Sequence, residues 1–169
     1  MLKNNGLSLK TVKIVDVGYN LIQGLLSGRA DAASGMDRNV ELIELKKLGK
    51  KVRVFYPEEN HVPIYSGLVY IANKHSLADP RLKKFMRAVT LGVQYLVNHP
   101  ESTWQKFATN HPDLNNKTTR AEWFATLPRF ALRPNAVDPV RVQNYAKFMQ
   151  QMGVIKWVPK TKQIAVELQ

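Results

Sequence analysis

The histidines are the side chains with the widest chemistry here, because imidazole binds metals and transfers protons near neutral pH. There are four of them: His61, His75, His99 and His111. None pairs with another at metal-ligand spacing, and the last two each precede a proline, as helix-boundary residues do. Cysteine is absent, as are the nucleophile-elbow, P-loop and dinucleotide-binding motifs. The sequence therefore predicts a binding protein rather than an enzyme, with no catalytic residue, metal site or cofactor.

A second group of candidate residues stands where a predicted strand ends and a predicted helix begins. It consists of Gly18, Tyr19 and Asn20. In open α/β sheets ligands bind at the carboxyl ends of strands, and the free N–H groups of a helix N-terminus suit an anion or a carbonyl oxygen. These residues are thus candidates for ligand binding, with Tyr19 lining a cleft. The alternative is that the Tyr19 ring packs over the end of the sheet.

The first seventy residues have an α/β pattern. β-branched and polar residues alternate from Thr11 to Val17, which predicts a strand. Apolar residues at helical spacing follow, with Asn20 as the expected N-cap and Gly28 as the closing glycine. A short second strand at 31–35 completes a compact β-α-β unit, which implies parallel strands. Further along, the pattern predicts a helix over 38–49, a strand over 52–55, a loop over 56–65 and a strand over 68–72.

From residue 79 onward the pattern is mainly helical. Asp-Pro pairs at 79–80 and 138–139 are strong helix starts, with aspartate as N-cap and proline in the first turn. A shorter helix is expected to open at Pro100, and the sequence from Thr119 to Glu122 fits a capping box before another helix. Apolar helical positions surround the three tryptophans, which are expected to pack in or beside the core: Trp104, Trp123 and Trp157.

Composition is that of a soluble globular domain, with 169 residues, 44% hydrophobic and a formal charge of +12. A chain of this size should bury roughly 70% of its unfolded surface. The positive charge is spread, +5 over residues 1–56 and +7 over 57–169, and no nucleic-acid motif accompanies it. A nucleic-acid partner is therefore not expected. No apolar run follows Lys3, so the chain shows no signal peptide, and no stretch approaches the length of a membrane span.

Two stretches carry a more specific pattern. They are VDVGYNLIQGLLSGRADAASGMDRNVELIE at 15–44 and NHVPIYSGLVYIAN at 60–73. In this order they resemble the thiamine-pyrimidine family of periplasmic binding proteins. That family holds bacterial transporter subunits that bind a thiamine pyrimidine precursor, and eukaryotic pyrimidine synthases of the same fold. The later stretches LPRFALRP and YAKFMQQMGVI are similar to its C-terminal region. The resemblance covers nearly all of residues 10–157.

The resemblance implies an α/β fold like that of type II periplasmic binding proteins, in which two lobes enclose a ligand cleft. It implies an incomplete copy, the C-terminal half, with a helix-rich C-terminal part. Residues 1–36 correspond to the end of the second lobe (β-α-β), and residues 37–169 to the return segment and C-terminal helices of the first. Such a fragment would expose sheet edges and apolar faces, so we expect a homodimer formed by exchange of elements. The parent protein is expected in the periplasm.

The resemblance also implies site residues. A family glutamate that hydrogen-bonds the aminopyrimidine corresponds to Glu41 in the motif R-N-V-E. A carboxylate can accept from the exocyclic amine and, sharing a proton, pair with a ring nitrogen. The alternative is a solvated glutamate in the first helical turn. Asn39 would orient the site or cap the helix. Asp37 replaces an aromatic residue that stacks on the pyrimidine in relatives, and Tyr65 belongs to a loop that faces the cleft.

The sequence thus favours the substrate-binding part of an ABC transporter for a thiamine pyrimidine precursor. Its lobes would close on the ligand, and the closed protein would dock on a membrane permease. Within the family the alternative is pyrimidine synthesis, which the resemblance ties to a histidine and a cysteine-rich iron motif; this chain has no cysteine. From another class, the alternative is a basic module that binds nucleic acid or an anionic surface.

Overall fold

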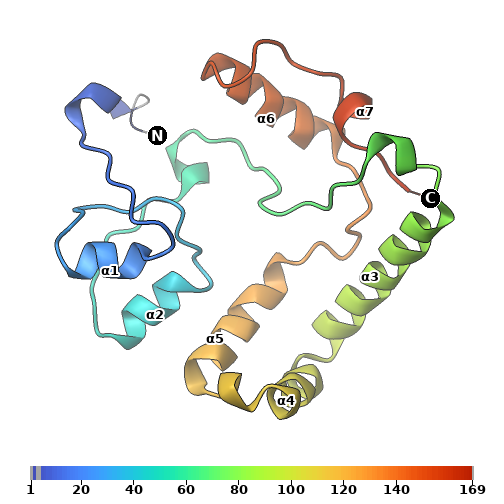
Figure 1. Ribbon diagram of the computed structural model, residues 1–169, viewed down its shortest axis with the longest axis horizontal. Coiled ribbons are helices and arrows are strands. Elements are labelled where there is room, and N and C mark those ends of the chain that lie inside the picture. The colour runs from blue at the N-terminus through green and yellow to red at the C-terminus, as the bar shows by residue number, and fades with distance from the viewer. Residues whose placement is uncertain (1, 3–4, 169) are drawn as a thin grey trace.

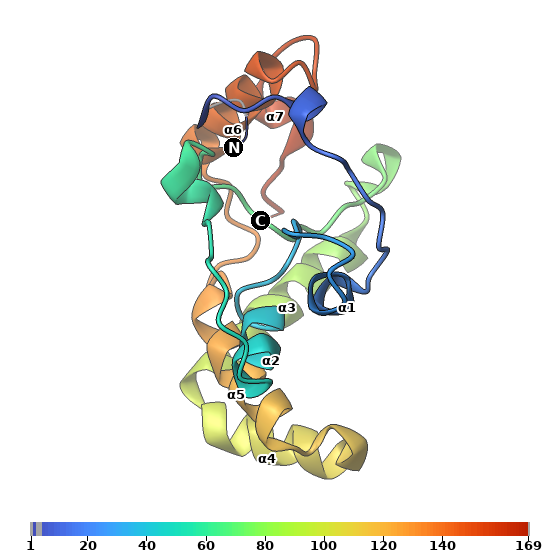
Figure 2. The same cartoon turned by 90° about the vertical axis from the view of Figure 1, so that its left-hand side faces the viewer.

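The computed structural model describes Leu2 and residues 5–168. These residues form α-helices joined by short 3-10 turns and long irregular segments, and no β-strand occurs among them. Figure 1 shows α1 beside α2, α5 next to α2, α3 leading down to α4, and α6 with α7 at the end of the molecule opposite to α4. The view at 90° also separates α6 and α7 from α4 and α5 (Figure 2). Within the described residues, no helix is long and apolar enough to cross a membrane.

The first two helices are short. Helix α1 (Leu21–Leu26) follows Asn20 as predicted, but the Asn20 side chain makes no capping hydrogen bond. Gly28, at φ +70°, closes the helix, where a left-handed backbone favours glycine. Helix α2 (Glu41–Lys47) begins three residues later than predicted, and its N-cap is Val40.

The predicted strands are the main correction to the sequence analysis. The segments at 11–17, 31–35, 52–55 and 68–72 have no ladder, and within the described residues no backbone hydrogen bond joins any of them to another. A strand is stable only beside a partner that takes up its N–H and C=O groups. β-propensity reports how side chains fit a sheet, and it cannot supply that partner. The prediction of strands is therefore wrong for this structure, while the expected helix-rich C-terminal part is confirmed.

The C-terminal helices follow their start signals closely. Asp79 accepts a hydrogen bond from the Arg81 N–H at 2.9 Å and opens α3 (Pro80–Asn98). Asp138 accepts from the N–H groups of residues 140 and 141 at 3.0 Å and opens α6 (Pro139–Gln151). Helix α4 (Pro100–Asn110) lies between histidines at its boundaries, as expected. A short helix near the C-terminus, α7 (Thr161–Ile164), completes the set.

Helix α5 (Lys117–Thr126) begins earlier than the predicted capping box. The Asn116 Oδ1 accepts hydrogen bonds from the Thr118 and Thr119 N–H groups at 2.9 and 3.0 Å, so Asn116 is the N-cap. Asparagine is among the strongest N-cap residues, and here it precedes the predicted threonine by three positions. The capping box predicted at Thr119 is therefore wrong, and Glu122 does not cap the helix.

The core is small and lies mainly among the C-terminal helices. Trp104 of α4 is only 5% exposed, and its ring centroid lies 5.7 Å from that of Trp123 of α5 in an edge-to-face arrangement. Phe107 lies 5.0 Å from the same Trp123 ring. Trp157, by contrast, is 69% exposed, so its predicted packing is not seen. The other buried apolar residues are Leu45, Met86, Ala108, Leu127 and Ala146.

The accessible surface is far larger than that of a self-contained domain. It is 13,514 Å², whereas a folded monomer of this mass should expose about 8,400 Å². The chain buries only about half of the surface that its unfolded form would expose. The expectation of roughly 70% burial is therefore wrong, because the extended segments bury little against one another.

Candidate ligand-binding site

The segment that leads into α2 is fixed by an arginine. The Arg38 guanidinium donates to both Glu58 carboxylate oxygens, at 2.7 and 3.0 Å, and lies 4.2 Å from the centroid of the Tyr56 ring. This bidentate pair raises the pKa of Arg38 and lowers the pKa of Glu58. Arg38 thereby ties the start of α2 to the 3-10 turn at Pro57–Asn60.

Of the residues expected to bind the ligand, Glu41 makes a local contact and Asn39 makes a contact with a distant part of the chain. The Glu41 Oε2 accepts a hydrogen bond from the Asp37 N–H at 2.7 Å, which closes the loop before the helix. Asn39 does not cap α2; its Nδ2 donates to the Thr126 Oγ1 at 2.8 Å. Because Thr126 ends α5, this bond joins the two helices beside Glu41. The structure therefore brings Asp37, Asn39 and Glu41 together at one end of α2.

Glu122 brings a further carboxylate to the α2–α5 contact. Its pKa is raised, first by burial and then by the negative charges of Glu44 and Glu41, with Lys47 acting in the opposite sense. Like charges that face each other in a partly buried place favour the protonated form of one of them. At the contact between α2 and α5, the nearby glutamates therefore help to raise the pKa of Glu122.

A cavity of about 270 Å³ opens beside Glu122. Aromatic rings dominate its wall, and the polar groups of one face of α5 complete it. The lining residues are Leu96, Phe107, Thr119, Glu122, Trp123, Thr126, Leu127 and Phe130. The Trp123 Nε1 is buried and has no hydrogen-bond partner among the residues that the structure describes. Aromatic faces with a few polar groups can hold a planar heterocycle by stacking, while a carboxyl group accepts from its amine.

The sequence analysis did not identify Glu122 as a site residue, because it assigned Glu122 to a capping box. A usable signal was present. Glu122 and Thr126 are four residues apart and therefore lie on one face of a helix, next to Trp123. That face also receives Asn39, a contact over 87 positions that no local pattern could indicate.

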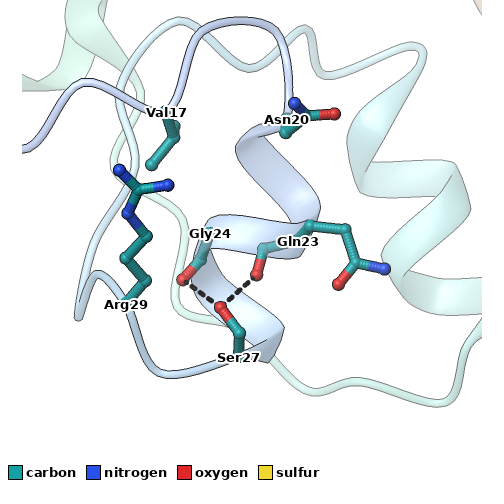
Figure 3. A pocket seen from close by; sticks show the side chains of 6 residues that line it. All are labelled: Val17, Asn20, Gln23, Gly24, Ser27 and Arg29. Carbon is teal, nitrogen blue, oxygen red and sulfur yellow. Dashed lines mark hydrogen bonds between the residues drawn. The ribbon is translucent and has the colours of Figure 1, made fainter.

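The residues before α1 border a separate cavity of about 290 Å³ (Figure 3). Its lining residues are Val17, Asn20, Gln23, Gly24, Ser27 and Arg29. Ser27 Oγ donates to the carbonyl oxygens of Gln23 and Gly24, at 2.7 and 3.5 Å (Figure 3). The Gly18 N–H donates to the Asp16 carboxylate at 2.8 Å. Tyr19 is fully exposed and does not line the cavity. Its ring therefore neither borders a ligand site nor packs on the described residues around it.

Tyr65 lies against the C-terminal helices. Its ring stacks on Tyr145 of α6, with centroids 4.6 Å apart and planes 20° from parallel. Within the described residues, no hydrogen bond or ring contact joins Tyr65, the Gly18–Asn20 group and Glu41 to one another. The predicted site residues thus form three groups rather than one. Among the same residues, no three His, Asp or Glu side chains gather where they could hold a metal ion.

These features define a helix-rich chain with cavities large enough for a small molecule and a glutamate of raised pKa at a helix contact. The family follows from comparison with known proteins. The NMT1/THI5-like family model matches residues 1–103, and the chain belongs to this family. No solved structure matches it.

Three relatives show the range of the family. A Haemophilus influenzae protein named as a thiamine biosynthesis protein is 38% identical over 100% of this chain and 54% of its own length. The formylaminopyrimidine-binding protein of Halalkalibacterium halodurans is 32% identical over 68% of this chain and 36% of its own. The 4-amino-5-hydroxymethyl-2-methylpyrimidine phosphate synthase of Aspergillus parasiticus is 25% identical over 92% and 48%. The chain therefore spans about half the length, or less, of these relatives.

Proposed function

We propose that this chain is part of a substrate-binding protein of an ABC transporter, and that its ligand is a thiamine pyrimidine precursor. The observation that carries the proposal is the α2–α5 contact, where Glu122 lines an aromatic cavity and the negative charge of Glu41 acts on it. Family membership supports it, since the relatives' names refer to thiamine biosynthesis and to pyrimidine binding and synthesis.

The carboxyl groups suit an aminopyrimidine for a chemical reason. The exocyclic amine offers N–H donors, and the carboxyl oxygens of a glutamate such as Glu41 can accept them. A ring nitrogen needs a donor, which a carboxyl group supplies when it keeps its proton, and the raised pKa of Glu122 favours that form. Phe107, Trp123 and Phe130 offer faces on which the ring can stack. Asn39 holds α2 against α5 and thereby positions Glu41.

The remaining candidate residues belong to the proposed closed state. In a two-lobed α/β protein of the type II periplasmic kind, residues 1–36 would end the second lobe and residues 37–169 would return through the first. Gly18, Tyr19 and Asn20 would then approach the ligand from the second lobe, and Asp37 and Tyr65 from the edge of the cleft. Closure of the lobes would prepare the protein to dock on a permease, with the whole protein in the periplasm.

Calorimetric titration tests the proposal, with 4-amino-5-hydroxymethyl-2-methylpyrimidine and formylaminopyrimidine as ligands. A ligand at 100 times its Kd should raise the free energy of unfolding by about 2.7 kcal/mol. Glu41→Gln should weaken binding at least about tenfold, since it loses a charge-assisted hydrogen bond. The control is Glu59→Gln, which changes an exposed glutamate of the 3-10 turn and should leave binding unchanged. Failure to bind either pyrimidine, or equal binding by both variants, contradicts the proposal.

Two further measurements separate the alternatives. Fungal relatives that are synthases make pyrimidine synthesis the second candidate, and mass spectrometry of the pyrimidine recovered after incubation distinguishes them, because a binding protein returns its ligand unchanged. A basic module for nucleic acid would bind a polynucleotide with a steep dependence on salt. Pyrimidine binding that is insensitive to salt supports the proposed function instead.

A further inference from the structure

A dense group of positive charges stands at the end of α2, which lies at the edge of the molecule (Figure 1). Five basic side chains occur within eight positions, all of them exposed, and no acidic residue occurs from 45 to 57. Leu48, which is 53% exposed, lies among them. We call this group the basic surface, and its cations are Lys46, Lys47, Lys50, Lys51 and Arg53.

The backbone fixes these side chains around the helix end. The Lys50 N–H donates to the Leu45 carbonyl oxygen at 2.9 Å, and the Gly49 N–H donates to that of Lys46 at 3.0 Å. With Gly49 in the left-handed region at φ +67°, these two bonds form a Schellman motif. The motif turns the chain back on itself, so that residues 50 and 51 stay beside the last turn of α2, which the buried Leu45 anchors.

The lysines are not used to cap the helix. Cations at a helix C-terminus often bond the last carbonyl groups, but here backbone N–H groups already occupy the carbonyl oxygens of residues 44, 45 and 46. Among the described residues, Lys46, Lys50 and Lys51 form no ion pair and no side-chain hydrogen bond. Lys47 differs, because its charge acts on Glu122. The hydrogen-bonding capacity of the other three lysines is therefore left for a partner outside the chain.

We propose that the basic surface binds a bilayer that contains anionic phospholipids. Groups of about four to eight cations bind such bilayers by summed attraction, with about a fivefold gain in affinity for each cation near the surface. Lysine suits this partner, since a compact charge on a flexible stem can follow a fluid array of headgroups, whereas the planar fork of arginine suits one fixed phosphate. Leu48 can enter the boundary between the headgroups and the acyl chains.

A polynucleotide is the competing partner, because it also carries dense negative charge. Proteins that bind single strands offer aromatic rings on which the bases stack. The ring beside the basic surface is Phe55, and the Arg53 guanidinium lies over it at 4.9 Å from the centroid, where a base would have to stack. An aliphatic side chain such as Leu48 also gains more from an acyl layer than from a phosphate backbone. These features favour the bilayer.

Vesicle co-sedimentation tests the proposal, with residues 1–169 and vesicles of phosphatidylcholine alone or with about one third phosphatidylglycerol. Binding should require the anionic lipid. It should weaken at least about tenfold when salt is raised from about 0.01 M to about 1 M, since the screening length falls from about 30 Å to about 3 Å. The mixture contains no pyrimidine, so the result does not depend on the proposed function.

Matched double variants make the test specific to the basic surface. Lys50→Gln with Lys51→Gln should lower the affinity for anionic vesicles at least about tenfold. Lys83→Gln with Lys84→Gln is the control, because it removes the same charge from exposed positions on α3 and should change the affinity by less than about twofold. All four positions are exposed, so the helical signal in circular dichroism should stay the same. Equal binding to neutral vesicles, equal weakening by both pairs, or tighter binding to a polynucleotide than to anionic vesicles at equal phosphate concentration would overturn the proposal.

Discussion

Residues 5–79 and residues 80–168 differ in where their backbone hydrogen bonds are made. In the second region, helices α3 to α6 satisfy most backbone groups within the same helix, and aspartate or asparagine side chains cap the starts of α3, α5 and α6. In the first region, two short α-helices and a few 3-10 turns lie among long segments that have no ladder. A helix needs only its own residues, whereas a strand needs a neighbour.

Side-chain burial repeats the contrast. The aromatic cluster of Trp104, Phe107 and Trp123 lies wholly in the second region. In the first region Leu45 is the one large apolar residue among the described ones that is fully buried, and it belongs to α2, which packs on α5. Leu45 is therefore buried where the first region touches the second. The buried apolar residues of the described chain therefore lie mainly in the helical region.

Amide hydrogen exchange should reveal the largest difference between the regions. Amides inside α3 and α6 are hydrogen-bonded and should exchange at least about a hundredfold more slowly than those of 12–17 and 68–72, which have no ladder. Mass spectrometry of exchanged peptides measures this directly. Protection of those segments in the chain alone would break the comparison.

Two tryptophans test whether stability resides in the helical core. Trp104→Ala should lower the free energy of unfolding by about 3–5 kcal/mol, because it empties a buried site that contacts two other rings. Trp157→Ala removes the same side chain from an exposed position and should change stability by less than about 0.5 kcal/mol. Urea denaturation followed by circular dichroism at the helix band provides both values. Similar losses in the two variants would show that the core lies elsewhere.

Two asparagines at helix starts, one in each region, allow a comparison of single capping hydrogen bonds. Asn116→Ala removes a side chain that caps two N–H groups of α5 and should cost about 1 kcal/mol. Asn20→Ala removes a residue in the same position before α1 that makes no capping bond, and the change should stay within about 0.5 kcal/mol. The same denaturation experiment applies. An equal cost at Asn20 would mean that α1 is capped after all.

Helices of the second region could be predicted from the sequence, whereas the strands predicted in the first region are not found. Helix starts at Asp79 and Asp138 are local signals, and the structure confirms them. The predicted strands would depend on pairing with segments far away in the sequence. Stretches such as Thr11 to Val17 have side chains suited to a sheet, but they do not indicate which segment would pair with them. The false capping box at Thr119 is a local competition that Asn116 wins, since its side chain reaches two N–H groups.

The site was harder to predict, because its contacts join residues far apart in sequence. The motif with Asn39 and Glu41 could be selected by resemblance, and the structure bonds Asn39 to Thr126 of α5 and Glu41 to the Asp37 N–H. Nothing in that motif indicates Thr126 or Glu122, which reach it only when the two helices pack. Tyr65 was selected as a cleft residue, and its stacking on Tyr145 depends on another such distant contact.

The smallest expected effect concerns the carboxyl groups at the α2–α5 contact and at the turn beside it. The pKa of Glu122 is raised in the folded protein above its ordinary value of 4.5, so the folded state holds this proton more tightly than the unfolded state. Glu122 therefore lowers stability when the pH is above its folded pKa, and the penalty disappears as the pH falls towards 4.5. Glu122→Gln should be more stable than the unchanged chain at pH 7, by about 0.5 kcal/mol, and equal to it near pH 4.

Glu58→Gln provides a control of opposite sign. The pKa of Glu58 is lowered by its bond with Arg38, so its contribution is present above the ordinary value and is lost as the pH falls through the folded one. This variant should therefore be less stable at pH 7, with the difference vanishing in acid. Thermal unfolding across pH 3–7 measures both variants. If Glu122→Gln behaved like Glu58→Gln, the carboxylates of α2 and α5 would not be close in solution, and the proposed pyrimidine site would lose its proton donor.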